Sequence, residues 1–154
     1  MGAAYFYHLT DSPVDATLPM LVGKSRGAGW RVLVRGPEGP LLPRLDDQLW
    51  KGDPTAFLPH GLAGGPHDAD QPVLLGTAVP ADGFDCLISV GGADLTASEV
   101  GLAQRACILF DGHDEAALNT ARGQWKSLTD AGCQAQYWAQ DAGSWVKKAQ
   151  AGSD

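Results

Sequence analysis

Short apolar runs bounded by turn residues alternate with amphipathic stretches along the chain, and this alternation restricts the folds it can adopt. The runs at residues 72–76, 86–90 and 107–110 are almost wholly apolar, which is typical of strands buried on both faces. Between the apolar runs, residues 15–28, 41–50 and 114–131 place apolar side chains at helical spacing. The pattern predicts an α/β fold of three layers, in which helices flank a mostly parallel sheet.

The remaining elements follow from local signals. Residues 4–9 are rich in aromatics and enter a Thr-Asp-Ser-Pro turn, and residues 30–34 and 134–139 also have strand composition. The longest helix is expected to begin at Asp114, a good N-cap residue, and to end at Gly132. Residues 61–71 are expected to form an exposed connection, and residues 145–149 a short basic helix.

Length and composition predict one domain. With 154 residues, 44% of them hydrophobic, the chain can bury a core without disulfides or a metal. We expect residues 1–150 to form this domain and residues 151–154 to be a frayed tail.

The cysteines and the apolar runs indicate the compartment. The three cysteines, Cys86, Cys107 and Cys133, are odd in number and lack a CxxC spacing, which is typical of buried thiols in a reducing compartment. No apolar run approaches the roughly 20 residues of a membrane helix, so we expect a cytoplasmic protein without membrane contacts.

Charge narrows the choice of partner. The chain holds 11 Lys and Arg residues against 18 Asp and Glu residues, a formal net charge of −7. Such a surface as a whole does not present the cation array that binding to duplex DNA requires, so we expect no direct sequence-specific contact with nucleic acid. Several of the cations gather in the last third of the chain, which favours a local basic patch.

Motifs for catalysis and cofactor binding are incomplete. The Gly-Lys-Ser at residues 23–25 lacks the earlier glycine of a phosphate-binding loop and lies inside a predicted helix. Gly91 and Gly92 follow a strand, but no GxGxxG is completed. The four histidines are scattered, and no serine lies in a GxSxG motif. We therefore predict no catalytic residue, no cofactor and no metal site.

Arg122, Trp125 and Lys126 form a constellation on the long helix. The two cations are four residues apart and Trp125 is three residues from Arg122, so the three side chains share one side of the helix. On an acidic protein such a site suits a peptide that is both acidic and aromatic-ended, because the apolar residue supplies affinity while the charges orient it. The alternative is a solvated helix face with Trp125 turned into the core.

A second constellation joins residues 46–50 to residues 57–60. Trp50 and Phe57 flank a proline-containing connection. Large aromatics are mostly buried, so the pair could belong to the core. Aromatics also concentrate at the centres of protein interfaces, so the pair could equally anchor a partner.

Together, the strand at 30–34, the Leu-Trp and Phe-Leu-Pro-His block and the Ala-Arg-x-x-Trp-Lys helix resemble the chi subunit family of bacterial DNA polymerase III. This resemblance implies a non-catalytic accessory subunit of the clamp loader, with a Rossmann-like fold that lacks a nucleotide site. It implies that Arg122, Trp125 and Lys126 bind the acidic C-terminal tail of single-stranded DNA-binding protein. It further implies that Trp50 and Phe57 contact the psi subunit or another clamp-loader protein. Leu118 stands where the family has a further lysine, which leaves the tail site less charge.

Two other functions remain open at this point. One is a small nucleotide-dependent hydrolase or transferase, with its site at the strand ends near residues 9–11 or 89–94, where open α/β sheets bind ligands. The other is a structural dimer that uses Trp50 and Phe57 on a second copy.

Overall fold

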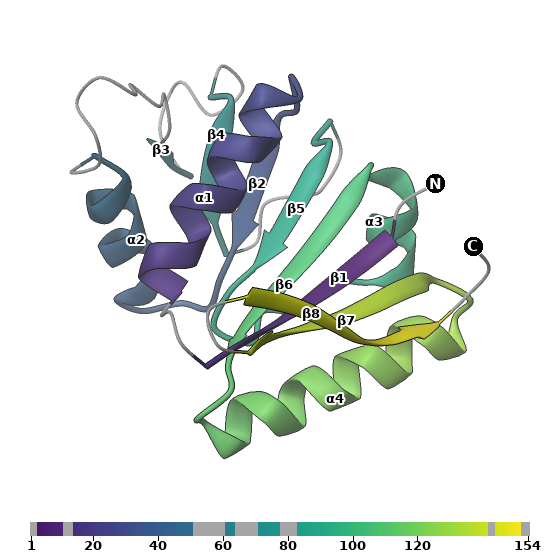
Figure 1. Cartoon of the computed structure of the whole chain (residues 1–154). Helices are drawn as coiled ribbons and strands as arrows, with labels where there is room; N and C mark the ends of the chain where they lie inside the picture. Colours follow the sequence, from purple (N-terminus) through teal and green to yellow (C-terminus); the bar gives the residue numbers. More distant parts are fainter. Residues whose placement is uncertain are drawn as a thin grey trace.

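The protein is described by a computed structural model covering residues 3–10, 14–50, 61–63, 71–77, 83–141 and 144–151. Within these ranges, strands and helices follow one another in an α/β order (Figure 1). The strands are β1 (Ala3–Leu9), β2 (Val32–Arg35), β3 (Gly61–Leu62), β4 (Val73–Gly76), β5 (Cys86–Ser89), β6 (Arg105–Asp111), β7 (Gln134–Asp141) and β8 (Ser144–Ala151). The helices are α1 (Val14–Gly27), α2 (Leu41–Trp50), α3 (Ala97–Leu102) and α4 (Glu115–Asp130).

All the described strands join one sheet, in the order β3-β4-β2-β5-β6-β1-β7-β8. Every pairing is parallel except that of β7 with β8. The crossovers from β1 and β2 run one way along the sheet through α1 and α2, and those from β5 and β6 run the other way through α3 and α4. Crossovers of one hand then place the two helix pairs on opposite faces. The predicted three-layer, mostly parallel α/β fold is confirmed.

Each face of the sheet has its own core. On one face, apolar side chains of α1 and α2 pack on the strands, among them Leu18, Val22 and Leu45. We call this the α1–α2 core. On the other face, Val100 of α3 and Leu128 of α4 pack beside buried strand residues, forming the α3–α4 core. Strands between two helix layers must be apolar on both faces, which explains the uniformly apolar runs of the sequence.

The long helix forms as its sequence predicts. The Asp114 side chain caps α4 by accepting hydrogen bonds from the N–H groups of Ala116 and Ala117, at 2.9 and 3.3 Å. At the other end, Gly132 has φ of 90°, a left-handed conformation that favours glycine and turns the chain into β7. Both predicted ends of this helix are confirmed to within two residues.

The predicted helix at residues 145–149 is wrong, because these residues belong to β8. β8 pairs antiparallel with β7, with Trp145 opposite Gln140 and Gln150 opposite Gln136. The strand continues to Ala151, the first of the residues expected in the tail. Hydrogen bonding to the open edge of β7 outweighs the weak helical preference of a short segment, a tertiary effect that local sequence does not report.

Two further elements went unpredicted. The short helix α3 begins at a capping box, in which Thr96 Oγ1 accepts from the N–H of Glu99 and the Glu99 carboxylate accepts from the N–H of Thr96. Its sequence signal, Thr-x-x-Glu before an apolar residue, is present in the chain. The short strand β3 lies at the start of the segment expected to be a connection, and it pairs with β4.

All three cysteines are free thiols in this structure. Cys86 and Cys107 are buried in neighbouring strands, and Cys133 is half-buried. No helix in the described ranges combines the length and apolar character needed to cross a membrane.

Candidate partner-binding site

Trp125 is one of the side chains through which α4 packs on the sheet. Its ring meets Phe6 of β1 edge-to-face, with centroids 5.3 Å apart, and meets Tyr137 of β7 at 6.1 Å. Phe6 is fully buried, whereas Trp125 is half-buried. The indole therefore packs on the α3–α4 core with one part and reaches the surface with another.

Arg122 lies one turn before Trp125 and is exposed. Its guanidinium donates a hydrogen bond to the Asn119 side-chain oxygen at 3.3 Å. Its charge also acts on two groups of the neighbouring strands, since it contributes to the lowered pKa of His8 and opposes the rise in the pKa of Tyr137. Arg122 thus brings a positive charge to the neighbourhood of β1 and β7.

His8 and Tyr137 extend this surface beyond the helix. The Nδ1 of His8 and the Tyr137 hydroxyl form a hydrogen bond of 2.8 Å, and both rings contact Phe110. Burial is the main cause that lowers the pKa of His8, with the nearby charge of His113 acting in the same direction. Burial also raises the pKa of Tyr137, against the charge of Arg122. Both groups are therefore held in their neutral forms near neutral pH.

Lys126 lies on the same helix but its ammonium group points along it toward the C-terminal end. Its Nζ is 3.1 Å from the Asp130 carboxylate, and the two side chains are 79% and 66% exposed. Arg122 instead reaches back toward Asn119, so the two cationic heads do not converge in this structure. An exposed pair such as Lys126 and Asp130 contributes about 1 kcal/mol or less, so Lys126 is easily redirected.

Arg122, Trp125, Lys126, His8 and Tyr137 together make what we call the α4 surface. The sequence placed the first three on one side of a helix, and the structure has all three there. His8 and Tyr137 were missed because they come from strands more than a hundred residues apart in the chain. The available signal is the alternation of β1, which puts His8 on the same face as the buried Phe6.

The structure does not test the predicted aromatic pair at residues 50 and 57. Trp50 is the last residue of α2, and its side chain lies outside what the structure describes, as does Phe57 altogether. The apolar face of α2 is confirmed, because Leu42, Leu45 and Leu49 are buried in the α1–α2 core. The partner role of Trp50 and Phe57 stays a prediction.

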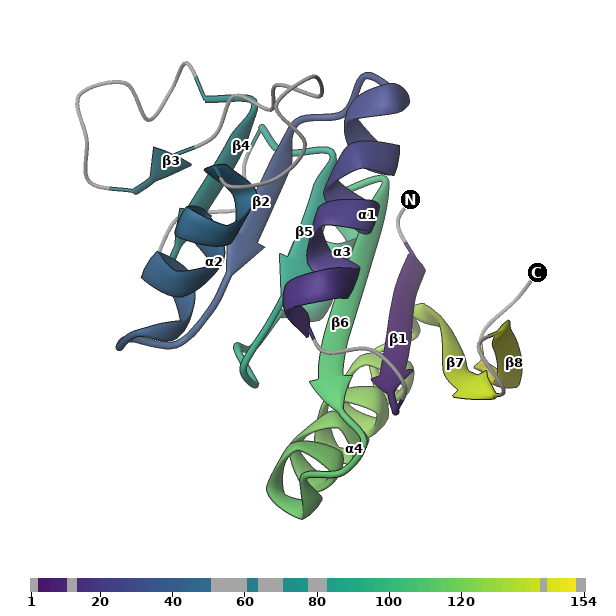
Figure 2. The same cartoon turned by 60° about the vertical axis from the view of Figure 1, so that its left-hand side comes forward.

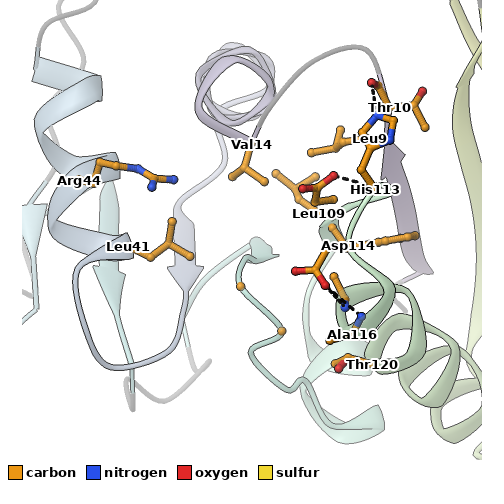
Figure 3. Close-up of a pocket in the computed structure, with 15 residues that line it drawn as sticks. Leu9, Thr10, Val14, Leu41, Arg44, Leu109, His113, Asp114, Ala116 and Thr120 are labelled. Carbon is orange, nitrogen blue, oxygen red and sulfur yellow. Dashed lines mark hydrogen bonds between the residues drawn. The ribbon is translucent and has the colours of Figure 1, made fainter.

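A pocket of about 660 Å³ lies at the carboxyl edge of the sheet, between α2 and α4 (Figure 3). Arg44 of α2 forms one wall, and Asp114 and His113 form the opposite one. His113 Nε2 donates to the Thr10 carbonyl at 2.8 Å. The first N–H groups of α4, which could otherwise hold a phosphate, are already bonded to the Asp114 carboxylate.

Metal-binding groups do not gather in the part of the chain that the structure describes. There, no three side chains of His, Cys, Asp or Glu are grouped so that they could hold an ion. His67, a histidine with carboxylates close to it in the sequence, at Asp68 and Asp70, lies outside the described residues, as do those two aspartates.

Comparison with known proteins gives the chain a family. The family model described as "DNA polymerase III chi subunit, HolC" matches residues 1–136 of the 154. None of the curated proteins matches the chain. The matched region includes every described strand up to the start of β7 and all four described helices, and it includes the α4 surface except Tyr137. The chain therefore belongs to the chi subunit family of DNA polymerase III.

Proposed function

We propose that this protein is a non-catalytic accessory subunit that links the clamp loader of DNA polymerase III to single-stranded DNA-binding protein. Membership of the chi family supports a place in the polymerase assembly. The observation that carries the finer proposal is Arg122, an exposed cation beside half-buried aromatic rings. In this proposal the acidic, Phe-ended C-terminal tail of single-stranded DNA-binding protein binds at the α4 surface.

The chemistry of the α4 surface suits such a tail. The hydrogen bond of Arg122 goes to an uncharged amide, so its positive charge is available to a carboxylate of the tail. The exposed part of Trp125 and the neighbouring Tyr137 offer apolar surface to a terminal aromatic ring. Lys126 can add a second contact once it leaves Asp130.

The affinity expected of this surface is modest. Leu118, in the place of a family lysine, packs on the α3–α4 core and adds no charge. A weak contact suffices for a tether, because a second contact to the clamp loader makes tail binding effectively intramolecular. We propose that Trp50 and Phe57 supply this second contact, to the psi subunit or another clamp-loader protein, on the strength of the family likeness.

Removing the Arg122 charge is expected to weaken tail binding. A labelled acidic peptide ending in Phe, titrated by fluorescence anisotropy, should bind Arg122→Ala about fivefold more weakly than the parent, since one exposed charge contact contributes about 1 kcal/mol. Added salt should weaken the binding of the peptide to the parent and reduce the difference in affinity between the parent and Arg122→Ala.

Arg44→Ala is the matched control, because it removes an exposed cation from α2 and should leave peptide affinity unchanged. A peptide that lacks its final Phe should bind poorly to every variant. Equal affinity of Arg122→Ala and the parent would refute the assignment of the tail site.

Nucleotides are expected not to bind the pocket at the carboxyl edge. The Asp114 carboxylate occupies the helix end where a phosphate would bind, and its negative charge repels a second anion there. The midpoint of thermal unfolding should therefore stay the same with and without nucleoside triphosphates and Mg²⁺. A concentration-dependent rise in this midpoint would favour the nucleotide-dependent enzyme instead.

A further inference from the structure

One half of the sheet carries aromatic side chains on a face that the described helices do not cover. Figure 2 shows α1 and α2 over the half that contains β2, β4 and β5, while β1, β7 and β8 extend beyond them. Because Phe6 faces the α3–α4 core, its neighbours Tyr5 and Tyr7 face the opposite side. Trp138 of β7 lies beside Tyr7 in the register of the two neighbouring strands, so its side chain is on the same face of the sheet as that of Tyr7.

These side chains line a groove of about 420 Å³ between the open sheet face and the edge of α1. Five aromatic residues contribute to it, and three of them are among the five tryptophans of the chain. They are Tyr5, Tyr7, Trp30, Trp138 and Trp145. Lys24 and Arg105 also line the groove, and none of its lining residues is acidic. On a chain of net charge −7, this is a local reversal of sign.

The two cations of the groove, Arg105 and Lys24, differ in how firmly their side chains are positioned. The Arg105 guanidinium lies 4.5 Å from the centre of the Tyr5 ring and 5.5 Å from that of Trp30, so two rings fix its position. Lys24 is exposed in the last turn of α1, where its long side chain is free to follow a ligand. Tyr7 and Trp145 meet edge-to-face at 5.2 Å, and both are half-buried against the α1–α2 core.

We propose that this groove binds single-stranded nucleic acid, without preference for sequence. Half-exposed aromatic rings on an open sheet face provide surfaces on which unpaired bases stack, and neighbouring cations neutralise the phosphates. Both features are found together here. They fit a ligand whose bases are planar and whose backbone carries a negative charge at every phosphate. A duplex fits poorly, because its bases are already stacked inside the helix. An acidic aromatic peptide carries fewer rings than this groove presents.

This site goes beyond the proposed tail contact and does not depend on it. Trp138 and Trp145 lie after residue 136, where the match to the chi family ends. The groove opens on the face of the sheet opposite to α4, because Tyr5 and Tyr7 alternate with Phe6. An oligonucleotide and a tail peptide can therefore be titrated separately, and failure of one leaves the other standing.

The test is a titration of the full chain into a fluorescently labelled oligothymidylate at low salt. We expect anisotropy to rise and tryptophan fluorescence to be quenched. Trp145→Leu keeps an apolar side chain but removes the ring, and should weaken binding about tenfold, whereas Trp145→Phe keeps a stacking surface and should retain most of the affinity. Arg44→Ala, on α2, is the control that should bind as the parent does.

Salt gives a second measure. With two cations against phosphates, the logarithm of the binding constant should fall with the logarithm of salt concentration at a slope of about −1.4, and Lys24→Ala should make it shallower by about 0.7. No binding at low salt would overturn the proposal, as would equal binding by Trp145→Leu and Trp145→Phe when both unfold at the parent's temperature. Equal affinity for a duplex of the same length would also overturn the proposal. So would displacement of the bound oligonucleotide by the acidic peptide.

Discussion

Replacing Phe6 by alanine is expected to lower the free energy of unfolding by about 3–5 kcal/mol. The side chain is fully buried in β1, a strand that pairs with β6 on one side and β7 on the other. Its ring also packs edge-to-face against Trp125, on the buried side of the α4 surface. The substitution therefore opens a cavity between the sheet and α4 and removes the edge-to-face contact that orients the indole.

Urea unfolding followed by circular dichroism measures this loss. Phe6→Leu, which fills much of the cavity, should lose clearly less than Phe6→Ala, so the comparison holds even if the alanine variant fails to fold. Leu102→Ala removes a side chain that is 71% exposed on α3, and should change stability by less than about 0.5 kcal/mol. Losses of similar size from Phe6→Ala and Leu102→Ala would contradict the proposed packing of α4.

Glu99→Ala is expected to have the second largest effect, and one that depends on pH. Glu99 and Arg35 form a two-pronged ion pair, with both N···O distances 2.8 Å and side-chain exposures of 22% and 11%. The hydrogen bond with Arg35 is the main cause that lowers the pKa of Glu99 from 4.5 to about 2. At about 1.4 kcal/mol per pKa unit, this corresponds to roughly 3 kcal/mol of stability at neutral pH.

The direction of the pH dependence follows from the lowered pKa. The carboxylate is stabilised in the folded chain, so its contribution is complete above about pH 4.5 and is lost as the pH falls toward 2. The difference in unfolding free energy between the parent and Glu99→Ala should therefore be largest at neutral pH and shrink between pH 4.5 and 2. Urea titrations at several pH values measure it.

Asp130→Ala is the control for this experiment, because it breaks an exposed ion pair with Lys126. It should cost less than about 1 kcal/mol, with little dependence on pH. A constant difference between the parent and Glu99→Ala from pH 7 to pH 2.5 would show that the ion pair does not contribute as described.

Much of the fold was predictable because burial on two faces leaves a strong signal. β4, β5 and β6 have runs of mostly apolar residues, and α4 has both of its end signals. β8 was not predictable, because its residues alternate weakly and it forms by pairing with the free edge of β7. α3 could have been predicted from Thr96 and Glu99 alone, since a capping box is a local signal.

The candidate sites divide in the same way. Helical spacing was enough to place Arg122, Trp125 and Lys126 on one side of α4. Spacing could not reveal that the heads of Arg122 and Lys126 are bonded in opposite directions, because each is set by its own polar neighbour. The groove lined by aromatic residues was missed for another reason: its side chains come from α1, the connection after it, β1, β6, β7 and β8, and only the sheet order brings them together.

The antiparallel pairing of β8 has a consequence for how the protein behaves at high concentration. If the sheet ended at β7, that strand would expose a row of unpaired backbone N–H and C=O groups, with which a strand of another molecule could pair. β8 instead forms the outer border there, and it exposes the adjacent residues Lys147 and Lys148. Lysines on an edge strand disfavour pairing with another strand, because two copies would bring like charges together. We therefore expect this border of the sheet to resist edge-to-edge association of one copy with another.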